Sequence, residues 1–443
     1  MKTHGFLLPG GAALFFLAAA ALFALLPGCP LPAAAAMALA LTLCFFASLR
    51  ALRGCLPGAV LCCAVVSAAL LLGRIPCFPR ETSDYTDFLL PWVERLRELG
   101  GLAGLGREIG NYNVPYMVIL ALISRLPLPP VYLIKLTSVL FDLLQAAALA
   151  LLVGRLGGGK LRPAVCFPLA LGLPTVFING AVWGQCDSVY VSLALLGLYL
   201  CLAEKPGWGM AAFGLSFAFK LQAVFLLPVV LPLLLARKVK WYHLPLFPAA
   251  YALAVSPAIL AGRSLRDTFL FYLRTASTAG SALNYNSASM YSLYYFYRLK
   301  DTGPAAKAGI LAAFALCLLV FLFFFLGRKR ITERSLLFAS LLLCCGLPLL
   351  LPHMHDRYFY FCDVLTLCAA CLVPETAAAV LLSQFASLLG YHAYFYMRFL
   401  LPMRLGFAGL CAVFLAALVL LLRELFFRRR GGSGLPPDRL RAG

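Results

Sequence analysis

The sequence predicts an all-α protein, a polytopic transmembrane bundle of about 12 to 14 helices. Composition indicates this class, because 63% of the 443 residues are hydrophobic, only 12% are charged, and the mean hydropathy is +0.92. Apolar runs long enough to cross about 30 Å of hydrocarbon recur along the whole chain. These runs are continuous and do not alternate with polar residues, so helices are expected and barrel strands are not.

The basic residues indicate how the chain crosses the membrane. Most of the net charge of +20 comes from short basic clusters between hydrophobic runs, and such clusters hold short loops on the cytoplasmic side. The clusters are Arg50 and Arg53; Arg155, Lys160 and Arg162; Arg237, Lys238 and Lys240; and Arg328, Lys329, Arg330 and Arg334. We therefore expect about fourteen crossings with both termini inside, and no nucleic-acid partner.

This path predicts one transmembrane domain over residues 1–430 and a disordered cytoplasmic tail over residues 431–443. Residues 74–130 form a first large outer loop, and residues 262–304 form a second. If the apolar run 114–126 crossed the membrane, the basic turn Arg155–Arg162 would lie on the outer side. The run is therefore predicted to be an interfacial helix of the first loop.

Chemistry is expected on the outer side, because most acidic residues fall there on this path. Six of the 17 lie between Glu81 and Glu108. Most of the 16 cysteines lie inside apolar runs, where they behave as small hydrophobes. Neither a disulfide framework nor a cysteine metal site is expected.

Asp84 and Asp87 in the first outer loop are the candidate catalytic residues. Being three apart, they would share a face on an α-helical turn. Phe88 and Trp92 place apolar surface beside them, and a carboxylate against apolar surface can serve as a general base. The alternative for two isolated aspartates is an ordinary solvated loop.

Two further polar segments contain residue types that bind sugars. Asn111–Tyr116 offers amides and phenols for hydroxyl-rich ligands, although it also fits an ordinary helix-entry turn. Trp183–Asp187 combines an aromatic ring, a carboxamide and a carboxylate, a common sugar-binding set. As an alternative, Asp187 and Ser188 would simply cap the next helix.

A cationic run near a late helix end suits a phosphate. It contains His353, His355, Asp356 and Arg357. The first three could suggest a metal, but they are too close in sequence to form a metal site without distant ligands. An Arg with two His can bind phosphate or pyrophosphate through charge-assisted hydrogen bonds. Lys220, between two short apolar runs, could reach the same anion or snorkel to the headgroups.

Two ionisable residues lie inside one predicted helix. Asp142 follows Lys135 by seven residues, and charges at that depth are rare in membrane helices. We expect the two to form a structural pair within the bundle.

Taken in order, these segments resemble the GT-C class of polytopic glycosyltransferases. The likeness is greatest to bacterial relatives of the mannosyl- and glucosyltransferases of GPI-anchor and N-glycan assembly, which use dolichyl- or polyprenyl-phosphate sugars. It is carried by Asp84-Tyr85, Trp92, Tyr112–Pro115, Trp183–Asp187, Lys220–Gln222 and His353–Arg357. Two features depart from the pattern: two extra helices precede the loop, and Asn113-Val114 stand where members often have prolines. Both departures concern the part of the pattern that relates to the acceptor, and neither changes the class.

The resemblance implies inverting transfer of a mannose- or glucose-like hexose from polyprenyl phosphate to a lipid-linked or cell-envelope glycan. The reaction would take place on the extracytoplasmic face of a bacterial plasma membrane, with donor, acceptor and bilayer as partners and without metal or cofactor. Asp84 would be the general base, with Asp87 as the other candidate. The donor phosphate would be bound by Arg357, His355, His353 and Lys220. The sugar or acceptor would be bound by Tyr85, Trp92, Tyr112, Asn113, Trp183, Gln185, Asp187 and Gln222.

Two other function classes remain open at this point. A lipid or solute transporter, or a flippase, would fit the short paired runs 208–220 and 222–236 and the intramembrane Asp142. Against it, the two halves of the chain show no repeat and carry few buried charges. A structural assembly subunit is the third possibility. The lack of room for a cytoplasmic nucleotide-binding domain favours an enzyme whose donor is carried in the bilayer.

Overall fold

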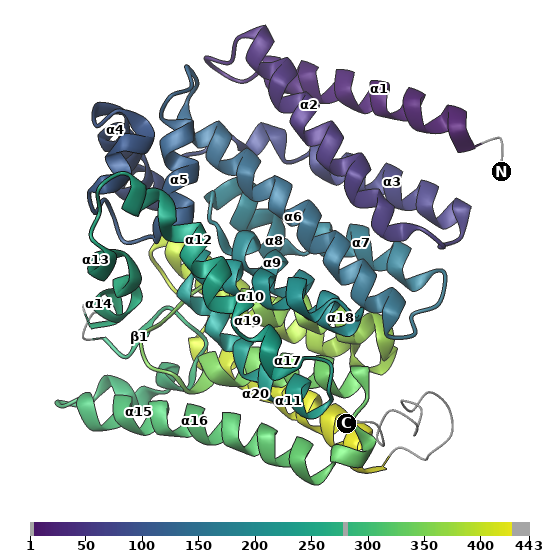
Figure 1. Ribbon diagram of the computed structural model, residues 1–443, viewed down its shortest axis with the longest axis vertical. Helices are drawn as coiled ribbons and strands as arrows, with labels where there is room; N and C mark the ends of the chain where they lie inside the picture. Colours follow the sequence, from purple (N-terminus) through teal and green to yellow (C-terminus); the bar gives the residue numbers. More distant parts are fainter. Residues whose placement is uncertain (1–3, 278–281, 428–443) are drawn as a thin grey trace. The chain divides into compact units, whose positions relative to one another are not determined.

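The computed structural model describes residues 4–277 and 282–427, and this part of the chain is almost entirely helical (Figure 1). The predicted disordered tail, residues 431–443, lies outside the described residues. The chain separates into two compact units. The first comprises Met1–Tyr199, Ala211–Ala223 and Pro245–Thr278, and the second comprises Leu200–Met210, Val224–Leu244 and Ala279–Gly443.

The first unit contains the helices that precede and follow the first predicted outer loop. They are α1 (His4–Ala24), α2 (Leu31–Ser48), α3 (Pro57–Leu72), α4 (Leu90–Glu98), α5 (Val114–Ile123), α6 (Pro130–Arg155), α7 (Arg162–Gly172), α8 (Pro174–Phe177), α12 (Leu246–Leu260), α13 (Leu265–Phe269) and α14 (Phe271–Ser277). Most of α9 (Asp187–Leu202) and the later part of α10 (Pro206–Phe219) also belong to it. Two π-helical segments, Tyr85–Leu89 and Ile178–Trp183, interrupt the α-helices.

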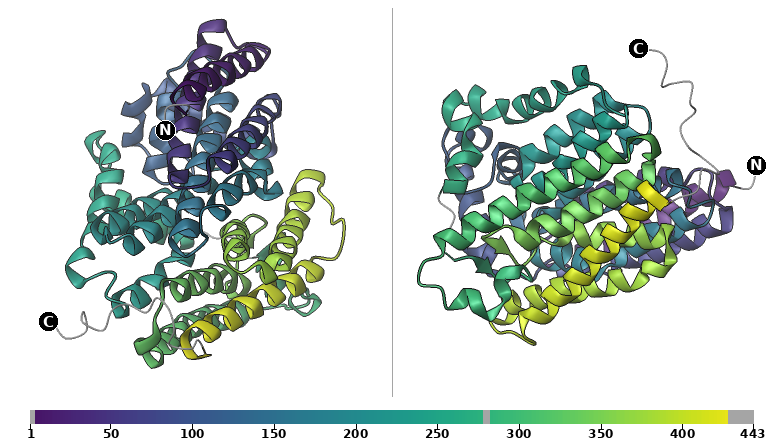
Figure 2. Two further views of the ribbon diagram at one scale, coloured as in Figure 1. Left: turned by 90° about the vertical axis from the view of Figure 1, so that its right-hand side faces the viewer. Right: turned by 90° about the horizontal axis from the view of Figure 1, so that it is seen from below.

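The second unit contains the later helices of the chain, which Figure 2 shows from two further sides. They are α11 (Val230–Leu235), α15 (Tyr294–Tyr297), α16 (Gly303–Leu326), α17 (Glu333–Leu350), α18 (Tyr360–Leu372), α19 (Ala377–Tyr396) and α20 (Met403–Leu422). α17 packs against α16, α18 and α20, and α19 packs between α18 and α20. The very short strands β1 (Asn284–Tyr285) and β2 (Met354–His355) pair in parallel, an element that the all-helical prediction did not include.

Seven helices of the described part are long and apolar enough to cross a membrane. The number is eight if α7 and the bent segment after it, Pro174–Trp183, form one span. The protein is therefore a polytopic helical membrane protein, as predicted. The number is about half of the fourteen crossings expected, because several apolar runs form shorter helices. These are Gly10–Ala24, Asp187–Leu202, Leu221–Leu235 and Tyr360–Leu372. Val114–Ile123 is also short, but it was not predicted to cross.

α6 is the central span of the first unit and packs against α2, α5 and α7. Proline at its first position suits a helix start, where the missing N–H has no intrahelical partner. Its buried Asp142 pairs with Arg74 at the end of α3, with 3.7 Å between Oδ2 and Nε. Lys135 instead donates to the carbonyls of Cys77 and Arg80. The structure thus pairs Asp142 with Arg74 and not with Lys135, which lies two helical turns away.

Candidate active site

The Asp84 carboxylate receives two hydrogen bonds from a segment about a hundred positions later in the chain. Trp183 Nε1 donates to Asp84 Oδ2 at 2.9 Å, and Gln185 Nε2 donates to the same oxygen at 2.5 Å. Asp84 is half-buried, whereas Trp183 and Gln185 are 1% and 3% exposed. Two donors from well-buried side chains therefore fix the orientation of a carboxylate that keeps some solvent exposure.

Asp87 lies in a different environment. Its side chain is exposed, and its carboxylate accepts a hydrogen bond from the neighbouring Thr86 hydroxyl at 2.9 Å. Asp84 directly precedes the π-helix Tyr85–Leu89, and Asp87 lies within it, so the two residues do not overlie one another as residues three apart do on an α-helix. The shared face predicted for the two aspartates is therefore wrong.

The turn that delivers Trp183 and Gln185 is held from several sides. It begins as the π-helix Ile178–Trp183 and ends at Gly184, whose φ of 78° is a left-handed conformation that glycine adopts without strain. The hydroxyl of Ser138 on α6 donates to the Gln185 carbonyl at 2.7 Å, and the Thr82 hydroxyl donates to the Trp183 carbonyl. The turn is thus attached both to the central span and to the segment that carries Asp84.

A row of aromatic rings leads toward this carboxylate. Ring centroids of Phe88 and Trp92 are 6.1 Å apart, those of Trp92 and Tyr112 are 5.6 Å apart, and those of Tyr112 and Tyr116 are 4.9 Å apart. Phe88 is 47% exposed and Tyr116 only 3%, so the row runs from the surface inward. The Tyr112 hydroxyl donates to the Gln185 side-chain oxygen at 3.2 Å, which connects the row to Asp84 through one amide.

Lys220 and Asp187 form a buried ion pair in the same unit. Lys220 Nζ lies 2.5 Å from Asp187 Oδ1, and Asn179 Nδ2 donates to Asp187 Oδ2 at 2.9 Å. Lys220 is 6% exposed, and its ammonium lies 5.8 Å from the centroid of the Tyr112 ring. The ammonium has three donors, of which this carboxylate takes one. Lys220, predicted for the donor phosphate, and Asp187, predicted for the sugar, are therefore direct partners.

Two other side chains fix the end of α10, just before Lys220. Asn113 Nδ2 donates to the Ala218 carbonyl at 3.0 Å, and the Tyr272 hydroxyl donates to the Phe217 carbonyl at 2.8 Å. These carbonyls belong to the last turn of α10, where intrahelical partners are missing. Asn113, predicted to bind sugar, is 1% exposed, and its Oδ1 accepts from the backbone of Val114 at the start of α5. Asn113 therefore links the start of α5 to the end of α10.

Tyr85 and Gln222, which were also predicted to bind sugar, differ in their surroundings. Tyr85 is 4% exposed, and burial, followed by the charge of Glu81, raises the pKa of its hydroxyl to about 12. Tyr85 is therefore a neutral packing residue next to Asp84. Within the described residues the buried Gln222 Oε1 atom has no hydrogen-bond donor, so it can still accept one from a ligand.

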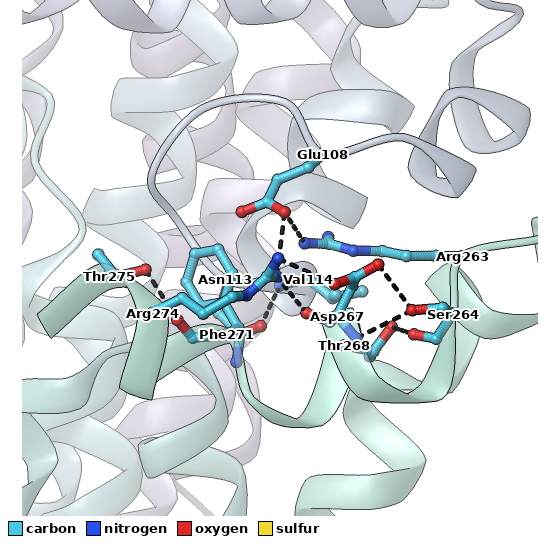
Figure 3. A network of polar contacts seen from close by, with 10 residues as sticks. All are labelled: Glu108, Asn113, Val114, Arg263, Ser264, Asp267, Thr268, Phe271, Arg274 and Thr275. Atoms are coloured by element: carbon cyan, nitrogen blue, oxygen red, sulfur yellow. Dashed lines mark hydrogen bonds and ion pairs between the residues drawn. The ribbon is translucent and has the colours of Figure 1, made fainter. Parts of the chain in front are cut away.

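A charged network holds the loop that precedes Asn113 (Figure 3). One oxygen of Glu108 lies 3.2 Å from an Arg263 nitrogen and 3.0 Å from an Arg274 nitrogen. Arg274 also pairs with Asp267 at 2.9 Å. The Ser264 hydroxyl and, to a lesser degree, Arg274 lower the pKa of Asp267 below its usual value. The network joins the first predicted outer loop to α13 and α14 in the second.

The three remaining predicted residues belong to the second unit. The His355 ring stacks on Tyr285, with centroids 4.6 Å apart and planes 10° from parallel. His353 Nδ1 forms a hydrogen bond of 2.7 Å with the Ala282 carbonyl. Arg357 lies 3.6 Å from Asp356 and is half-buried. The β1–β2 pairing thus holds the cationic run against residues 282–285.

The described residues contain no group of three or more His, Cys, Asp and Glu side chains that could hold a metal ion. Two buried or half-buried carboxylates of the first unit are bonded to amides, an indole and a cation. Asp84 is bonded to Trp183 and Gln185, and Asp187 is bonded to Asn179 and Lys220.

The sequence profile of Glycosyltransferase family 87 (GT87) matches residues 111–352, more than half of the chain. The chain belongs to Glycosyltransferase family 87. This is a family of GT-C polytopic membrane glycosyltransferases, which agrees with the resemblance noted above. A comparison with curated proteins found no match.

Family membership decides between the function classes left open by the sequence. A GT87 protein is a glycosyltransferase, so the transporter and assembly-subunit interpretations are set aside. The matched residues include Tyr112, Trp183, Gln185 and Lys220, whereas Asp84 precedes them. Asn179 and Tyr272 were missed by sequence reasoning. The sequence signal that could have indicated Asn179 is its position, one helical turn before Trp183.

Proposed function

We propose that this GT87 enzyme transfers a hexose, mannose- or glucose-like, from polyprenyl phosphate to a lipid-linked or cell-envelope glycan. The observation that carries the proposal is the Asp84 carboxylate, which two buried donors orient and which Gln185 links to a row of aromatic rings. A fixed carboxylate suits a general base, and aromatic faces with nearby amides suit a sugar ring. The polyprenyl donor follows from the resemblance and from the seven or eight helices of the described part that are long and apolar enough to cross a membrane.

In this mechanism Asp84 accepts the proton of the acceptor hydroxyl. The acceptor oxygen attacks C1 of the donor sugar from the face opposite the phosphate. One C–O bond forms, the bond between C1 and the phosphate oxygen breaks, and the configuration at C1 inverts. Polyprenyl phosphate leaves with the bonding electrons, so neither a redox partner nor a cofactor is required.

The leaving phosphate needs positive charge, because its negative charge increases as the bond breaks. In the first unit Lys220 is the proposed donor to it, and the resemblance assigns the same role to Arg357, His355 and His353 of the second unit. Arg357 can offer a bidentate fork, and two N–H groups of Lys220 remain beyond the one directed to Asp187. Trp92, Tyr112, Trp183, Gln185 and Gln222 are the proposed sugar contacts. Tyr85, Asn113 and Asp187 support them from inside the protein.

We place the reaction on the extracytoplasmic side of a bacterial plasma membrane. The support comes from the first unit, where Leu56 N donates to the Lys160 carbonyl at 3.1 Å. This bond brings two basic clusters, Arg50–Arg53 and Arg155–Arg162, to the C-terminal end of α6. The Asp84 segment lies beside the N-terminal turns of α6, through the bonds of Lys135 and Ser138. Basic clusters favour the cytoplasmic side, so the Asp84 carboxylate is expected on the extracytoplasmic side.

The test compares Asp84→Asn with Asp87→Asn in purified enzyme supplied with a polyprenyl-phosphate hexose and an acceptor glycolipid. Release of polyprenyl phosphate measures turnover. Asp84→Asn should lower kcat by about 10²- to 10⁴-fold, the usual contribution of a general base. Asp87→Asn should stay close to wild type, because its side chain is exposed and bonded only to its neighbour among the contacts described above.

Both variants must show the wild-type melting temperature for the comparison to count. If Asp84→Asn keeps its turnover while Asp87→Asn loses it, Asp87 is the base and the proposed site is wrong. If labelled lipid crosses the bilayer without release of polyprenyl phosphate, the polyprenyl-phosphate donor is wrong.

A further inference from the structure

A shallow pocket of about 590 Å³ lies in the first unit where α4 and α5 end, outside the residue set proposed for transfer. It is lined by Arg97 near the end of α4 and by residues 124–129, which connect α5 to α6. Arg97 and Arg125 are its only charged lining residues. The connection is rich in proline, so its backbone is held open and offers few competing N–H donors.

Both arginines are held in place by their surroundings. Arg97 Nε donates to the Ser124 carbonyl at 3.0 Å, which fixes its guanidinium at the pocket wall. The carbon chain of Arg125 lies over Gly101, so closely that a Cβ there would be 2.9 Å from Arg125 Cδ. Within residues 4–277 and 282–427 the Arg125 guanidinium makes no hydrogen bond or ion pair. One held cation and one unpaired cation therefore face the same pocket.

Acidic side chains do not line this pocket. Glu98, on the same helix as Arg97, is paired with Arg95, with 2.7 Å between the charged atoms. The positive charge of Arg97 and Arg125 is therefore available to an anion from outside the chain. Planar guanidinium groups bind phosphate oxygens in a bidentate manner.

The position of the pocket along the chain indicates where this anion comes from. The membrane span α6 begins at Pro130, directly after the pocket residue Pro129, so the pocket lies at one end of a span. Leu122 and Leu126 beside it are 53% and 46% exposed, which gives the basic pocket an apolar border. A basic pocket with apolar neighbours at a span end matches a phospholipid, whose phosphate and acyl chains meet at this level.

We propose that this pocket binds the phosphate of an anionic phospholipid, held between Arg97 and Arg125. The site is independent of the transfer reaction, and no donor or acceptor role is assigned to it. A free phosphate ion shares the chemistry of the headgroup, but it has no acyl chains to cover the exposed Leu122 and Leu126. The bilayer lipid is therefore the occupant that the pocket and its border favour together.

The test measures how much phosphatidylglycerol stays bound after the protein is reconstituted in phosphatidylcholine vesicles doped with phosphatidylglycerol and extracted into detergent. Native mass spectrometry counts the retained lipid. Arg125→Gln should lower retention about tenfold, because it removes a charge-assisted hydrogen bond to the phosphate. Arg97→Gln should act in the same direction, and Arg125→Lys, which keeps the charge but loses the fork, should fall between Arg125→Gln and wild type.

The matched control is Arg95→Gln, which removes the same charge from α4 outside the pocket and should leave retention unchanged. Arg125 is exposed and without a hydrogen bond in the described part of the chain, so its variants should melt as the wild type does. Retention that is equal in wild type and Arg125→Gln overturns the site. Displacement of the lipid by an equal concentration of inorganic phosphate overturns the lipid as its occupant.

Discussion

The difference between Asp84 and Asp87 lies in their bonded neighbours, since the two residues share chemistry and are three positions apart. Asp84 Oδ2 is bonded to an indole and to a carboxamide that are almost fully buried. Asp87 is bonded to a hydroxyl at the surface. A base has to hold its position while it takes a proton, so the better-held carboxylate is the better candidate.

Trp183→Phe tests this orientation directly. The change removes the N–H that reaches Asp84 at 2.9 Å and keeps an apolar ring of similar shape. A hydrogen bond to a charged group contributes about 1.5–3 kcal/mol, so kcat should fall about ten- to hundredfold while KM changes little. Steady-state kinetics with varied acceptor separate the two constants.

Tyr112→Phe is the matched control for Trp183→Phe. It removes a hydroxyl that bonds to the Gln185 side chain and not to Asp84, so its effect on kcat should be smaller. A Trp183→Phe enzyme with normal kcat and a lowered melting temperature would show that the indole only packs.

The residue types of this site could be predicted from the sequence, but their pairing could not. Asp84, Trp183, Gln185 and Lys220 stand out because polar groups are rare in such an apolar chain. That Gln185 binds Asp84, and that Lys220 binds Asp187, depends on helices brought together by tertiary packing. One sequence carries no signal for contacts between residues this far apart. For the same reason the partner of Asp142, Arg74, was missed.

Two π-helical segments determine how the elements present these residues. Tyr85–Leu89 follows Asp84, and Ile178–Trp183 ends at the indole that reaches it. Each π turn adds a residue to the helical repeat and rotates the side chains that follow. Hydrophobic periodicity does not distinguish such a turn from an α-helix or a loop, so the α-helical turn considered for Asp84 and Asp87 was wrong.

Glu108→Gln tests the network that joins the loop before α5 to α13 and α14. The Arg263 side chain is only 7% exposed, so the change leaves a buried cation without its carboxylate. Because Glu108 itself is 44% exposed, we expect a loss of about 1–2 kcal/mol of unfolding free energy, less than for a fully buried pair. Thermal unfolding in detergent would show a lower melting temperature.

Asp267→Asn is the control for this network, since Asp267 and its partner Arg274 are both more than 40% exposed. It should lower the melting temperature less than Glu108→Gln does. Replacing Arg263 by Met in the Glu108→Gln background should restore part of the loss, because the unpaired cation is then gone. Equal effects of Glu108→Gln and Asp267→Asn would contradict the importance of the buried arginine.

For the whole molecule, hydropathy predicted the class correctly and the number of crossings less well. Long apolar runs specify membrane helices because lipid leaves few other ways to satisfy the backbone. The prediction of fourteen crossings counted every apolar run except 114–126, whereas seven or eight helices of the described part are long enough. Prolines divide apolar runs into shorter helices, and mean hydropathy does not detect such breaks. At Pro174, for example, the segment Pro174–Trp183 is bent by 51° relative to α7.

The proposed side of the reaction can be tested through α6, which has 26 residues and a length of roughly 39 Å. This length exceeds the hydrocarbon thickness, so its two ends lie on opposite sides of the membrane. Glu81→Cys near the N-terminal end and Lys160→Cys beyond the C-terminal end are both exposed positions outside the proposed machinery. A membrane-impermeant maleimide should label Glu81→Cys in intact cells and Lys160→Cys only after permeabilisation. The wild-type chain gives the background from the native cysteines. Labelling in the reverse order would place the Glu81 end of α6, and Asp84 with it, on the cytoplasmic side. The basic clusters at the Lys160 end would then lie outside, against the proposed orientation.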